Sequence, residues 1–255
     1  MEKVVKIENL SKRYKKSAVL AVDDFSLECF EGEIVGLLGH NGAGKSTTLK
    51  CLTGMLPPTS GKITVCGYDV QKEPVKAKST FGFVSDKHDV FVKMTGLEYL
   101  NFIADAYGVS KAERIQRYEE LEKIFRLEDR VFDVINDYSH GMRQKICMMG
   151  SLKHHPKLWI LDEPMIGLDP LTSARVREFM KKYVSEGNCI LFSTHNIASV
   201  QKVCSRAVII ANSKKLADFN VADFEANNDM TLEEYFLQIT DGAQNDAPET
   251  EERFE

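Results

Sequence analysis

Residues 34–53 have the sequence IVGLLGHNGAGKSTTLKCLT, in which three kinds of local structure follow one another. The apolar run from Ile34 to Leu38 predicts a buried strand. A glycine-rich segment follows directly, and residues 45–53 have a helical composition. The segment from Gly39 to Ser46 satisfies the pattern G-x-x-x-x-G-K-[ST], and a strand before it and a helix after it are the context that this pattern requires.

The glycine-rich segment predicts a phosphate-binding loop. Backbone N–H groups can all point into one concavity here, because glycine leaves the backbone uncovered and accepts unusual dihedral angles. The positive end of the following helix adds to this. We expect Lys45 to reach the β- and γ-phosphates and to serve in catalysis, the Ser46 hydroxyl to ligate Mg²⁺, and Thr47 to contact the α-phosphate. The residues expected to hold the nucleotide are Gly39, Asn41, Gly42, Ala43, Gly44, Lys45, Ser46 and Thr47. A chance glycine-rich turn is the alternative, and the strand and helix around the loop argue against it.

Two acids end another apolar run. Residues 158–163 read LWILDE, which predicts a buried strand with Asp162 and Glu163 at its tip. Beside a phosphate loop, Asp162 can hold Mg²⁺, and Glu163 can orient or deprotonate an attacking water. The alternative is an acid pair that caps the helix after Pro164.

Outside these two segments, strands alternate with helices, which indicates an α/β fold with a mainly parallel sheet. Further strands are expected at residues 4–7, 18–22, 25–29, 62–66, 81–84, 189–192 and 207–210. Residues 95–107 and 111–125 are expected to be helical, and the block from about 87 to 156 is interpreted as a helical insertion. The second of these helices places a row of apolar side chains on one face, namely Ile115, Tyr118, Leu121, Ile124 and Phe125.

The charge of the chain is concentrated at its C-terminus. The net charge is −5, and residues 241–255 alone contain six acids and one arginine, so the first 240 residues are neutral overall. A neutral body argues against a general nucleic-acid binder, and the acidic tail is expected to be disordered.

We find no apolar run long enough to span a bilayer and no signal peptide. The six cysteines form no CxxC pair and are interpreted as core residues in a reducing compartment.

Taken together, the motifs resemble the nucleotide-binding subunit of an ABC transporter. Tyr138 to Gln144 resembles that family's L-S-G-G-Q signature loop, with Ser139 placed 23 residues before Asp162. Gly167-Leu168-Asp169 resembles the D-loop, and His195 occupies the position of the switch histidine. Tyr14 stands where the family stacks an aromatic ring on adenine. The match extends from about residue 3 to residue 240, within an ATPase domain expected at residues 1–240, and residues 241–255 form the acidic tail.

This resemblance implies a P-loop NTPase (RecA-like) core, an N-terminal antiparallel β subdomain and an inserted helical subdomain. It implies that two antiparallel copies bury two ATP molecules with Mg²⁺, with Ser139 and Gly141 of one copy facing the γ-phosphate held by the other. His195 would sense or polarise that phosphate, and the alternative is that it is an ordinary helix-cap histidine. Asp169 would link the two sites, and the alternative is that it is only the N-cap of a helix. Residues 232–237 resemble the corresponding segment of the bacterial export-type branch. This implies a separate membrane chain and a location at the cytoplasmic face of the membrane.

Two positions depart from the family pattern. Ser85-Asp86 stands where the family has a glutamine that meets Mg²⁺, and we expect Asp86 to ligate the metal with altered hydrolysis. His140 replaces the first signature glycine and is expected to face solvent.

A membrane contact is expected from residues 85–105, where Val90, Phe91, Val92 and Met94 offer apolar groups. The alternatives are a soluble ABC ATPase acting on ribosomes or DNA, a nucleotide-dependent regulator with weak hydrolysis, and a P-loop kinase.

Overall fold

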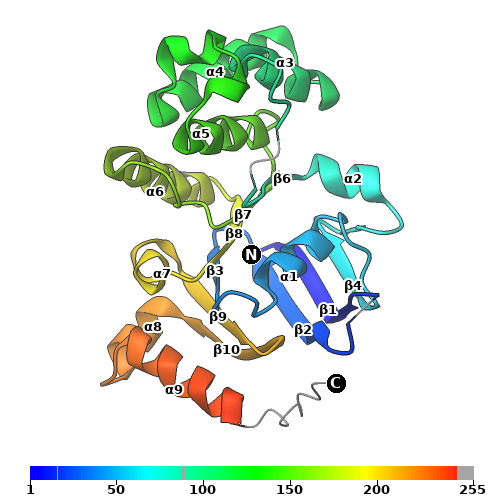
Figure 1. The fold of residues 1–255 in the computed structure, drawn as a ribbon, viewed down its shortest axis with the longest axis vertical. Helices are drawn as coiled ribbons and strands as arrows, with labels where there is room; N and C mark the ends of the chain where they lie inside the picture. Colours follow the sequence, from blue (N-terminus) through cyan, green and yellow to red (C-terminus); the bar gives the residue numbers. More distant parts are fainter. Residues whose placement is uncertain (16, 88–89, 246–255) are drawn as a thin grey trace, which may run out of the picture.

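The computed structural model describes residues 1–15, 17–87 and 90–245 (Figure 1). The strands are β1 (Lys3–Arg13), β2 (Leu20–Phe30), β3 (Ile34–Leu38), β4 (Ser60–Val65), β5 (Tyr68–Asp69), β6 (Phe81–Val84), β7 (Leu158–Asp162), β8 (Cys189–Thr194), β9 (Arg206–Ala211) and β10 (Lys214–Asn220). The helices are α1 (Lys45–Leu52), α2 (Pro74–Ser79), α3 (Gly96–Ala106), α4 (Lys111–Phe125), α5 (His140–Ser151), α6 (Pro170–Ser185), α7 (Ile197–Val203), α8 (Val221–Asn227) and α9 (Leu232–Asn245), with short 3-10 helices η1 (Glu128–Phe132) and η2 (Ile135–Asp137).

The central sheet has the strand order β10-β9-β3-β8-β7-β6. All neighbouring pairs from β9 to β6 are parallel, and only β10 is antiparallel to its neighbour β9. Strands β3, β7 and β8 are buried along their whole length, as expected for parallel strands covered on both faces. The predicted mainly parallel α/β sheet is confirmed.

Alternate residues of these strands face two separate cores. One face, which includes Leu38, Trp159 and Phe192, packs beneath α5, α6 and α7. The other face, which includes Val35 and Ile160, packs against α1 and the N-terminal strands. Both faces of the sheet are therefore covered, which fixes the loops that leave the carboxyl ends of β3, β7 and β8.

The N-terminal strands form a second, antiparallel sheet of order β2-β1-β4-β5, as predicted (Figure 1). Residues 18–22 and 25–29 were expected to be two strands, but the structure has the single strand β2. Asp24 interrupts it locally with a φ of 50°, facing Asn9 at 48° on β1. The Asn9 amide donates to the Asp24 carboxylate at 2.8 Å, so this irregularity bends the strand pair without ending it.

Helices α3, α4 and α5 lie between β6 and β7 in the sequence and stand together at one end of the molecule (Figure 1). Leu121 and Phe125 of α4 are buried in their core, as predicted. Ile115, predicted on the same face, is 65% exposed, because α4 makes its core contacts through its C-terminal half.

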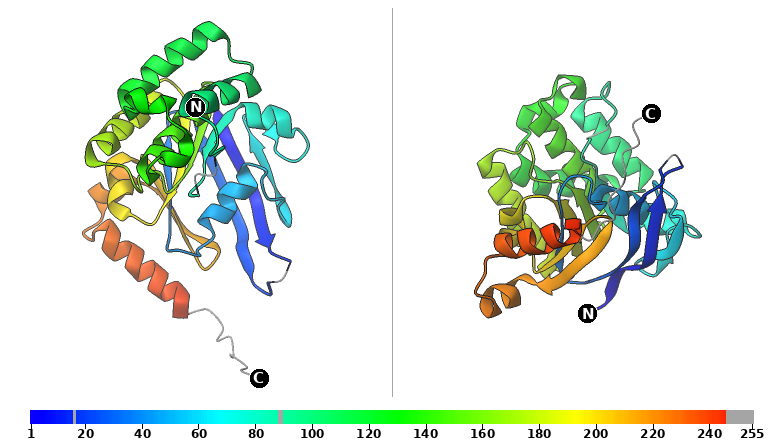
Figure 2. Two further views of the ribbon diagram at one scale, coloured as in Figure 1. Left: turned by 45° about the horizontal axis from the view of Figure 1, so that its top comes forward. Right: turned by 60° about the horizontal axis from the view of Figure 1, so that its bottom comes forward.

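The C-terminal helix α9 lies at the edge of the molecule beside β9 and β10 (Figure 2). It continues to Asn245, so the expected disordered tail is wrong for residues 241–245. Thr240 is buried and its hydroxyl donates to the Phe236 carbonyl, which shows that packing of α9 persists to the start of this segment. Residues 246–255 lie outside the described part of the chain.

Candidate nucleotide-binding site

The loop between β3 and α1 has a backbone that only glycine can adopt at two positions. Gly42 and Gly44 have φ values of 84° and 110°. A side chain at Gly44 would place its Cβ 2.5 Å from the Ala21 carbonyl, and one at Gly39 would clash with the Ile210 carbonyl. The glycines therefore let the loop pack directly against the backbone of Ala21 and Ile210, and they leave the N–H groups of the loop uncovered for an anion.

Lys45 is 5% exposed and its ammonium is held at the mouth of this loop. It donates to the carbonyls of Gly39 at 2.7 Å and His40 at 3.0 Å, and lies 3.9 Å from the Glu163 carboxylate. Burial lowers the pKa of this lysine, and the nearby carboxylates oppose that effect. A buried cation held mainly by carbonyls is well placed to exchange them for phosphate oxygens.

Asp162 ends β7 directly opposite Ser193 of β8, whose hydroxyl donates to its Oδ1. Burial raises the pKa of Asp162, the hydroxyls of Ser193 and Ser46 oppose this, and the charges of Asp86 and Glu163 raise it further. Its second oxygen, Oδ2, is buried and has no hydrogen-bond partner among the residues that the structure describes.

An orphaned carboxylate oxygen beside the Ser46 hydroxyl has the donor chemistry that suits Mg²⁺. Within residues 1–15, 17–87 and 90–245, no cluster of three His, Cys, Asp or Glu side chains is arranged to hold a metal by itself. The residues therefore fit a cation that is completed by phosphate oxygens.

Glu163 follows with a left-handed backbone, φ 51°, which few non-glycine residues adopt. Its carboxylate accepts from the Thr194 hydroxyl at 3.1 Å and pairs with His195 Nδ1 at 2.8 Å. The register of β7 and β8 explains this contact, because the loops that leave two parallel neighbours emerge at the same sheet edge. The structure thus brings Lys45, Glu163 and His195 together, as their assignment to one site requires.

Lys45 and Glu163 border a cavity of about 210 Å³ at the carboxyl edge of the sheet, whereas Asp162 and His195 lie outside its lining. It is lined by Ala21, Asn41, Gly42, Gly44, Lys45, Ser46, Thr47, Asp86 and Glu163. Asp86 therefore faces the phosphate loop, although it lies in a different loop after β6. The side chain of Ala43, which is predicted to contribute to nucleotide binding, is buried in the core, and Ala43 is not among the residues that line the cavity. Ala21 on β2 joins the cavity without any signal in the sequence, because only the packing of the second sheet brings it there.

Tyr14 lies at the edge of this cavity. Its hydroxyl is 3.2 Å from the Thr47 hydroxyl, and the residue is 43% exposed. The Lys12 ammonium lies 5.9 Å from the ring centre. The ring is therefore beside the phosphate loop and open to a flat ligand.

The signature-like segment lies away from this cavity. Ser139 is the N-cap of α5, accepting from the Met142 N–H at 3.3 Å, and it is exposed. Neither Ser139 nor Gly141 lines the cavity around Lys45. A side chain at Gly141 would meet the Gly167 carbonyl at 2.5 Å, and one at Gly167 would clash with the His140 ring. His140 is exposed, as predicted, but its ring also covers Gly167.

Asp169 is the N-cap of α6. It accepts from the Thr172 N–H at 2.8 Å and pairs with Lys145 of α5 at 3.3 Å. The bonds from Thr172 hold the pKa of Asp169 well below its usual range. The N-cap alternative is thus present in the structure, and Asp169 also ties α6 to the signature helix.

A mainly parallel sheet in which a glycine-rich loop joins β3 to α1, with acids at the tip of a nearby strand, defines a P-loop NTPase. The chain belongs to the ABC transporter family, because the family model described as ABC transporter matches residues 22–166. It is the ATP-binding subunit of such a transporter and an ABC-type ATPase.

The chain is similar to several curated proteins. It is 37% identical to the ABC transporter ATP-binding protein NatA of Bacillus subtilis over 81% of this chain and 85% of that protein. It is 36% identical to the linearmycin resistance ATP-binding protein LnrL of the same organism, over 84% and 68%. It is 30% identical to a methionine import ATP-binding protein, MetN 1 of Oceanobacillus iheyensis, over 93% and 73%.

Solved structures agree in fold. The structure of an ATP-binding subunit of an ABC transporter superposes with a TM-score of 0.87 at 32% identity, covering 93% of this chain and 99% of that one. A dimeric ATP-binding cassette in a post-hydrolysis state, bound to ADP and Pi, gives a TM-score of 0.77 at 25% identity, covering 85% and 98%.

Proposed function

We propose that two copies of this chain dimerise on ATP and power a separate membrane permease, and that the complex is an exporter. The proposal rests on one observation: the phosphate loop and the N-terminus of α5 are separate, and the second is exposed within one chain. The Ser139 hydroxyl and the Gly141 N–H can donate to an anion, but only one that another copy presents. The similarity to a dimeric cassette supports this arrangement.

Within each copy, ATP is held by the loop from Gly39 to Ser46 and by Thr47, with Tyr14 against the adenine. Mg²⁺, when bound, would be held by Ser46, Asp162 and Asp86, and would neutralise charge on the β- and γ-phosphates. Asp86 can complete this set because it faces the cavity, yet unlike glutamine it adds a negative charge and donates no hydrogen bond.

Hydrolysis needs a base beside the γ-phosphate. Glu163 is assigned this role: it accepts the proton of the attacking water while Lys45 stabilises charge on the phosphate oxygens. His195 fixes the carboxylate through its hydrogen bond and polarises the γ-phosphate. Asp169, tied to α5 through Lys145, connects the base of one site with the signature segment that serves the other.

The permease contact is proposed on the surface formed by Phe91, Val92 and Phe102. Phe91 is 52% exposed, and its ring meets that of Phe102 edge-to-face with 5.0 Å between the ring centres. The loop before α3 and α3 itself therefore form one exposed apolar patch. Val90 and Met94, expected in the same contact, are partly buried against the core of the helical insertion. That packing removes them from the proposed surface.

The location follows from this contact. Among the described residues no helix combines the length and apolar character needed to cross a bilayer. The chain is proposed to attach to the cytoplasmic face of the membrane through its permease. Export is favoured by the resemblance of residues 232–237 to the export-type branch and by the similarity to a resistance protein. The chain is also similar to a methionine import protein, so a transport assay in vesicles is needed to test the direction of transport.

The first test compares ATP hydrolysis by the purified wild-type chain and by Glu163→Gln, together with ATP-dependent dimerisation in size-exclusion chromatography. We expect a Mg²⁺-dependent rate that the substitution abolishes, with the variant trapped as a dimer by ATP. Ser139→Ala is the matched variant for the second surface, and it should weaken dimerisation while leaving ATP binding intact. ATP binding without any dimer, with or without the permease, would contradict the proposal and favour a nucleotide-dependent regulator.

A further inference from the structure

Gln144 lies in the first half of α5, and it is 0% exposed. Its Nε2 donates to the Pro164 carbonyl at 2.9 Å, across 20 residues of sequence. Its Oε1 is also buried and has no hydrogen-bond partner among the residues that the structure describes. One half of this amide is therefore engaged, and it holds the residue that directly follows Glu163.

The half-engaged amide of Gln144 is costly in a buried position. An unpaired buried polar atom costs free energy that an apolar side chain of the same shape does not. Methionine is unbranched, has about the length of glutamine and would fill the same space without that cost. Packing alone therefore does not account for glutamine at position 144, whereas the bond to Pro164 does.

Pro164 passes the restraint on to Glu163. The peptide bond between the two residues is planar, and the pyrrolidine ring fixes the φ of Pro164 at about −65°. Only the ψ angles of Glu163 and Pro164 remain soft, and ψ of a residue before proline is itself restricted. The bond from Gln144 thus holds one end of a short, stiff segment whose other end is the Cα of Glu163.

The loop that carries Glu163 depends on its neighbours. The Glu163 N–H donates to the Ser193 carbonyl of β8 at 3.1 Å. Inside the loop, the Ile166 N–H lies 3.4 Å from the Glu163 carbonyl, and the Leu168 N–H lies 3.4 Å from the Met165 carbonyl. Both distances are long beside the usual value of about 2.9–3.0 Å. The loop is therefore held from outside, by β8 on one side and by α5 on the other.

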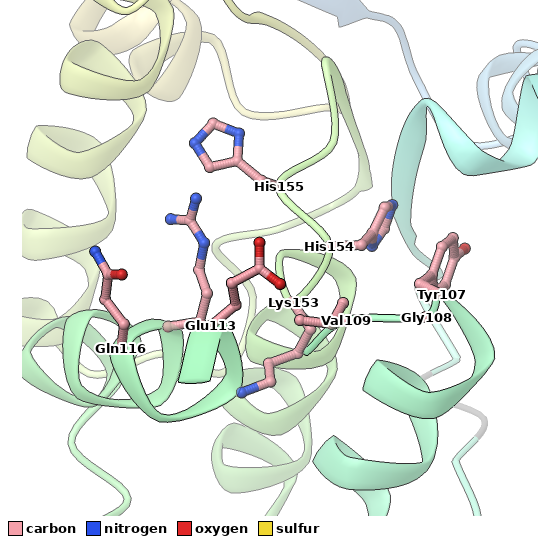
Figure 3. A pocket seen from close by; sticks show the side chains of 9 residues that line it. Tyr107, Gly108, Val109, Glu113, Gln116, Lys153, His154 and His155 are labelled. Atoms are coloured by element: carbon pink, nitrogen blue, oxygen red, sulfur yellow. The ribbon is translucent and has the colours of Figure 1, made fainter. Parts of the chain in front are cut away.

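The C-terminal end of α5 is anchored to its surroundings. Just after the helix, the Lys153 ammonium donates to the Arg114 carbonyl of α4 at 3.1 Å, and in Figure 3 it points away from the neighbouring cavity. The His154 ring stacks on the Tyr107 ring with 3.7 Å between the ring centres, as Figure 3 shows, and its Nε2 lies 3.0 Å from the Phe81 carbonyl of β6. Because this end of α5 is fixed, Gln144 offers Pro164 a stiff point of attachment.

The other end of α5 is the segment that meets the second nucleotide in the proposed dimer. At 1.5 Å per residue, Gln144 lies roughly 7.5 Å along the helix from its N-cap Ser139. Gly141, between them, packs directly on the same loop as Gln144, since a Cβ there would lie 2.5 Å from the Gly167 carbonyl. One helix therefore carries both the donors for the second nucleotide and the donor that holds the loop of Glu163.

We propose that Gln144 is a positioning residue for ATP hydrolysis: its amide holds the Pro164 carbonyl and thereby keeps Glu163 in place when α5 engages the ATP of the other copy. This inference rests on the function proposed above, which assigns Glu163 as the base. Gln144 does not line the cavity around Lys45, so it is not a ligand of the nucleotide. Its loss should slow the chemical step without weakening ATP binding.

Gln144→Met tests this, because it removes the amide and keeps the length of the side chain. Phosphate release gives kcat and KM, fluorescent-nucleotide titration gives the Kd for ATP, and calorimetry gives the melting temperature. We expect kcat to fall on the order of 10- to 100-fold with the Kd unchanged, as for a base displaced by about 1 Å. The melting temperature should stay close to that of wild type, because removal of the unpaired Oε1 offsets the lost bond.

Asn188→Leu is the matched control. Asn188 is also a buried amide that donates to a backbone carbonyl, that of Tyr183 at 3.1 Å. It precedes β8, at the end of the strand remote from His195. Asn188→Leu should lower the melting temperature and leave kcat unchanged. The same pattern in Gln144→Met would show a merely structural role and would overturn the proposal.

Dimerisation separates this inference from the proposed function. Glu163→Gln combined with Gln144→Met should still be trapped as a dimer by ATP, because Gln144 is buried and touches no second copy. Loss of the dimer in the double variant alone would show that Gln144 supports dimerisation rather than the base, and would overturn the inference.

The remaining outcomes are also distinct. If Glu163→Gln alone forms no ATP-dependent dimer, the proposed function fails, and kcat of Gln144→Met still decides whether Gln144 positions Glu163. A trapped dimer together with a wild-type kcat in Gln144→Met would overturn the inference alone. If Gln144→Met does not fold, Gln144→Asn, whose amide is one methylene further from Pro164, should show the same loss of kcat.

Discussion

The Glu163 carboxylate and the His195 imidazole meet in a hydrogen bond of 2.8 Å across 32 residues of sequence. Each comes from the loop after a different strand, β7 for Glu163 and β8 for His195. This hydrogen bond restrains the orientation of the Glu163 carboxylate, the group assigned as the base.

For His195→Ala, we predict a loss of ATP turnover of about 10²–10⁴-fold with little change in ATP affinity, because the base loses its orienting partner. Turnover is measured by phosphate release and affinity by fluorescent-nucleotide titration. His195→Ala that hydrolyses ATP at the wild-type rate would show that this histidine only caps the segment before α7.

For Asp86→Ala, we predict a higher Mg²⁺ concentration at half-maximal hydrolysis, by several-fold, because one carboxylate ligand is removed from the cavity. Asp86→Gln, which installs the family residue, is the informative companion: it should recover turnover more fully than alanine does. Mg²⁺ titrations of the steady-state rate check both, and unchanged rate and Mg²⁺ dependence in Asp86→Ala would reject the role.

Tyr14→Ala should weaken ATP binding. A base stacked on an aromatic ring contributes about 1–3 kcal/mol, which corresponds to a Kd about five- to 150-fold higher. Tyr14→Phe keeps the ring but loses the hydroxyl contact with Thr47, so it should bind ATP nearly as well as wild type. An equal Kd for wild type and Tyr14→Ala would place adenine elsewhere.

The proposed permease surface gives a paired prediction. Phe91→Glu should abolish co-purification with the membrane chain while leaving nucleotide affinity unchanged, because it adds charge to an exposed apolar patch. Ile115→Glu is the control, because Ile115 is an apolar residue on α4 outside the patch and, at 65%, is somewhat more exposed than Phe91. Co-purification of Phe91→Glu at wild-type yield would move the contact to another surface.

Asp162 links pH to stability. Its pKa is raised by burial, so the folded state binds a proton more tightly than the unfolded state. Stability is therefore lost as pH rises from the unfolded pKa of about 3.9 through the raised folded value. Asp162→Asn should raise the melting temperature at neutral pH in the absence of nucleotide and Mg²⁺, and have little effect in acid. Calorimetry across this range tests the sign, and a lower melting temperature at neutral pH would contradict it.

Much of this arrangement could be predicted from local sequence. The loop from Gly39 to Ser46 is a motif whose residues are contiguous, and Asp162 and Glu163 end a short apolar run that favours a buried strand. What escaped prediction depends on contacts between distant segments. Strand β10 is polar because it lies at the sheet edge, so no apolar run marks it. The burial of Lys153 depends on α4 folding over it, which no pattern around residue 153 encodes.

The interlock of His140 with Gly167 constrains how the sequence can vary. The ring of His140 fills the space over Gly167, and a Cβ added at position 167 would collide with that ring. Positions 140 and 167 therefore cannot change independently. In a library randomised at both, functional variants should keep glycine at 167 wherever histidine stays at 140. Because the φ of 79° strains any side chain at 167, an alanine there should be rare even beside a small residue at 140. The pair would thus be visible as covariation between two loops that the sequence separates by a whole helix and a strand.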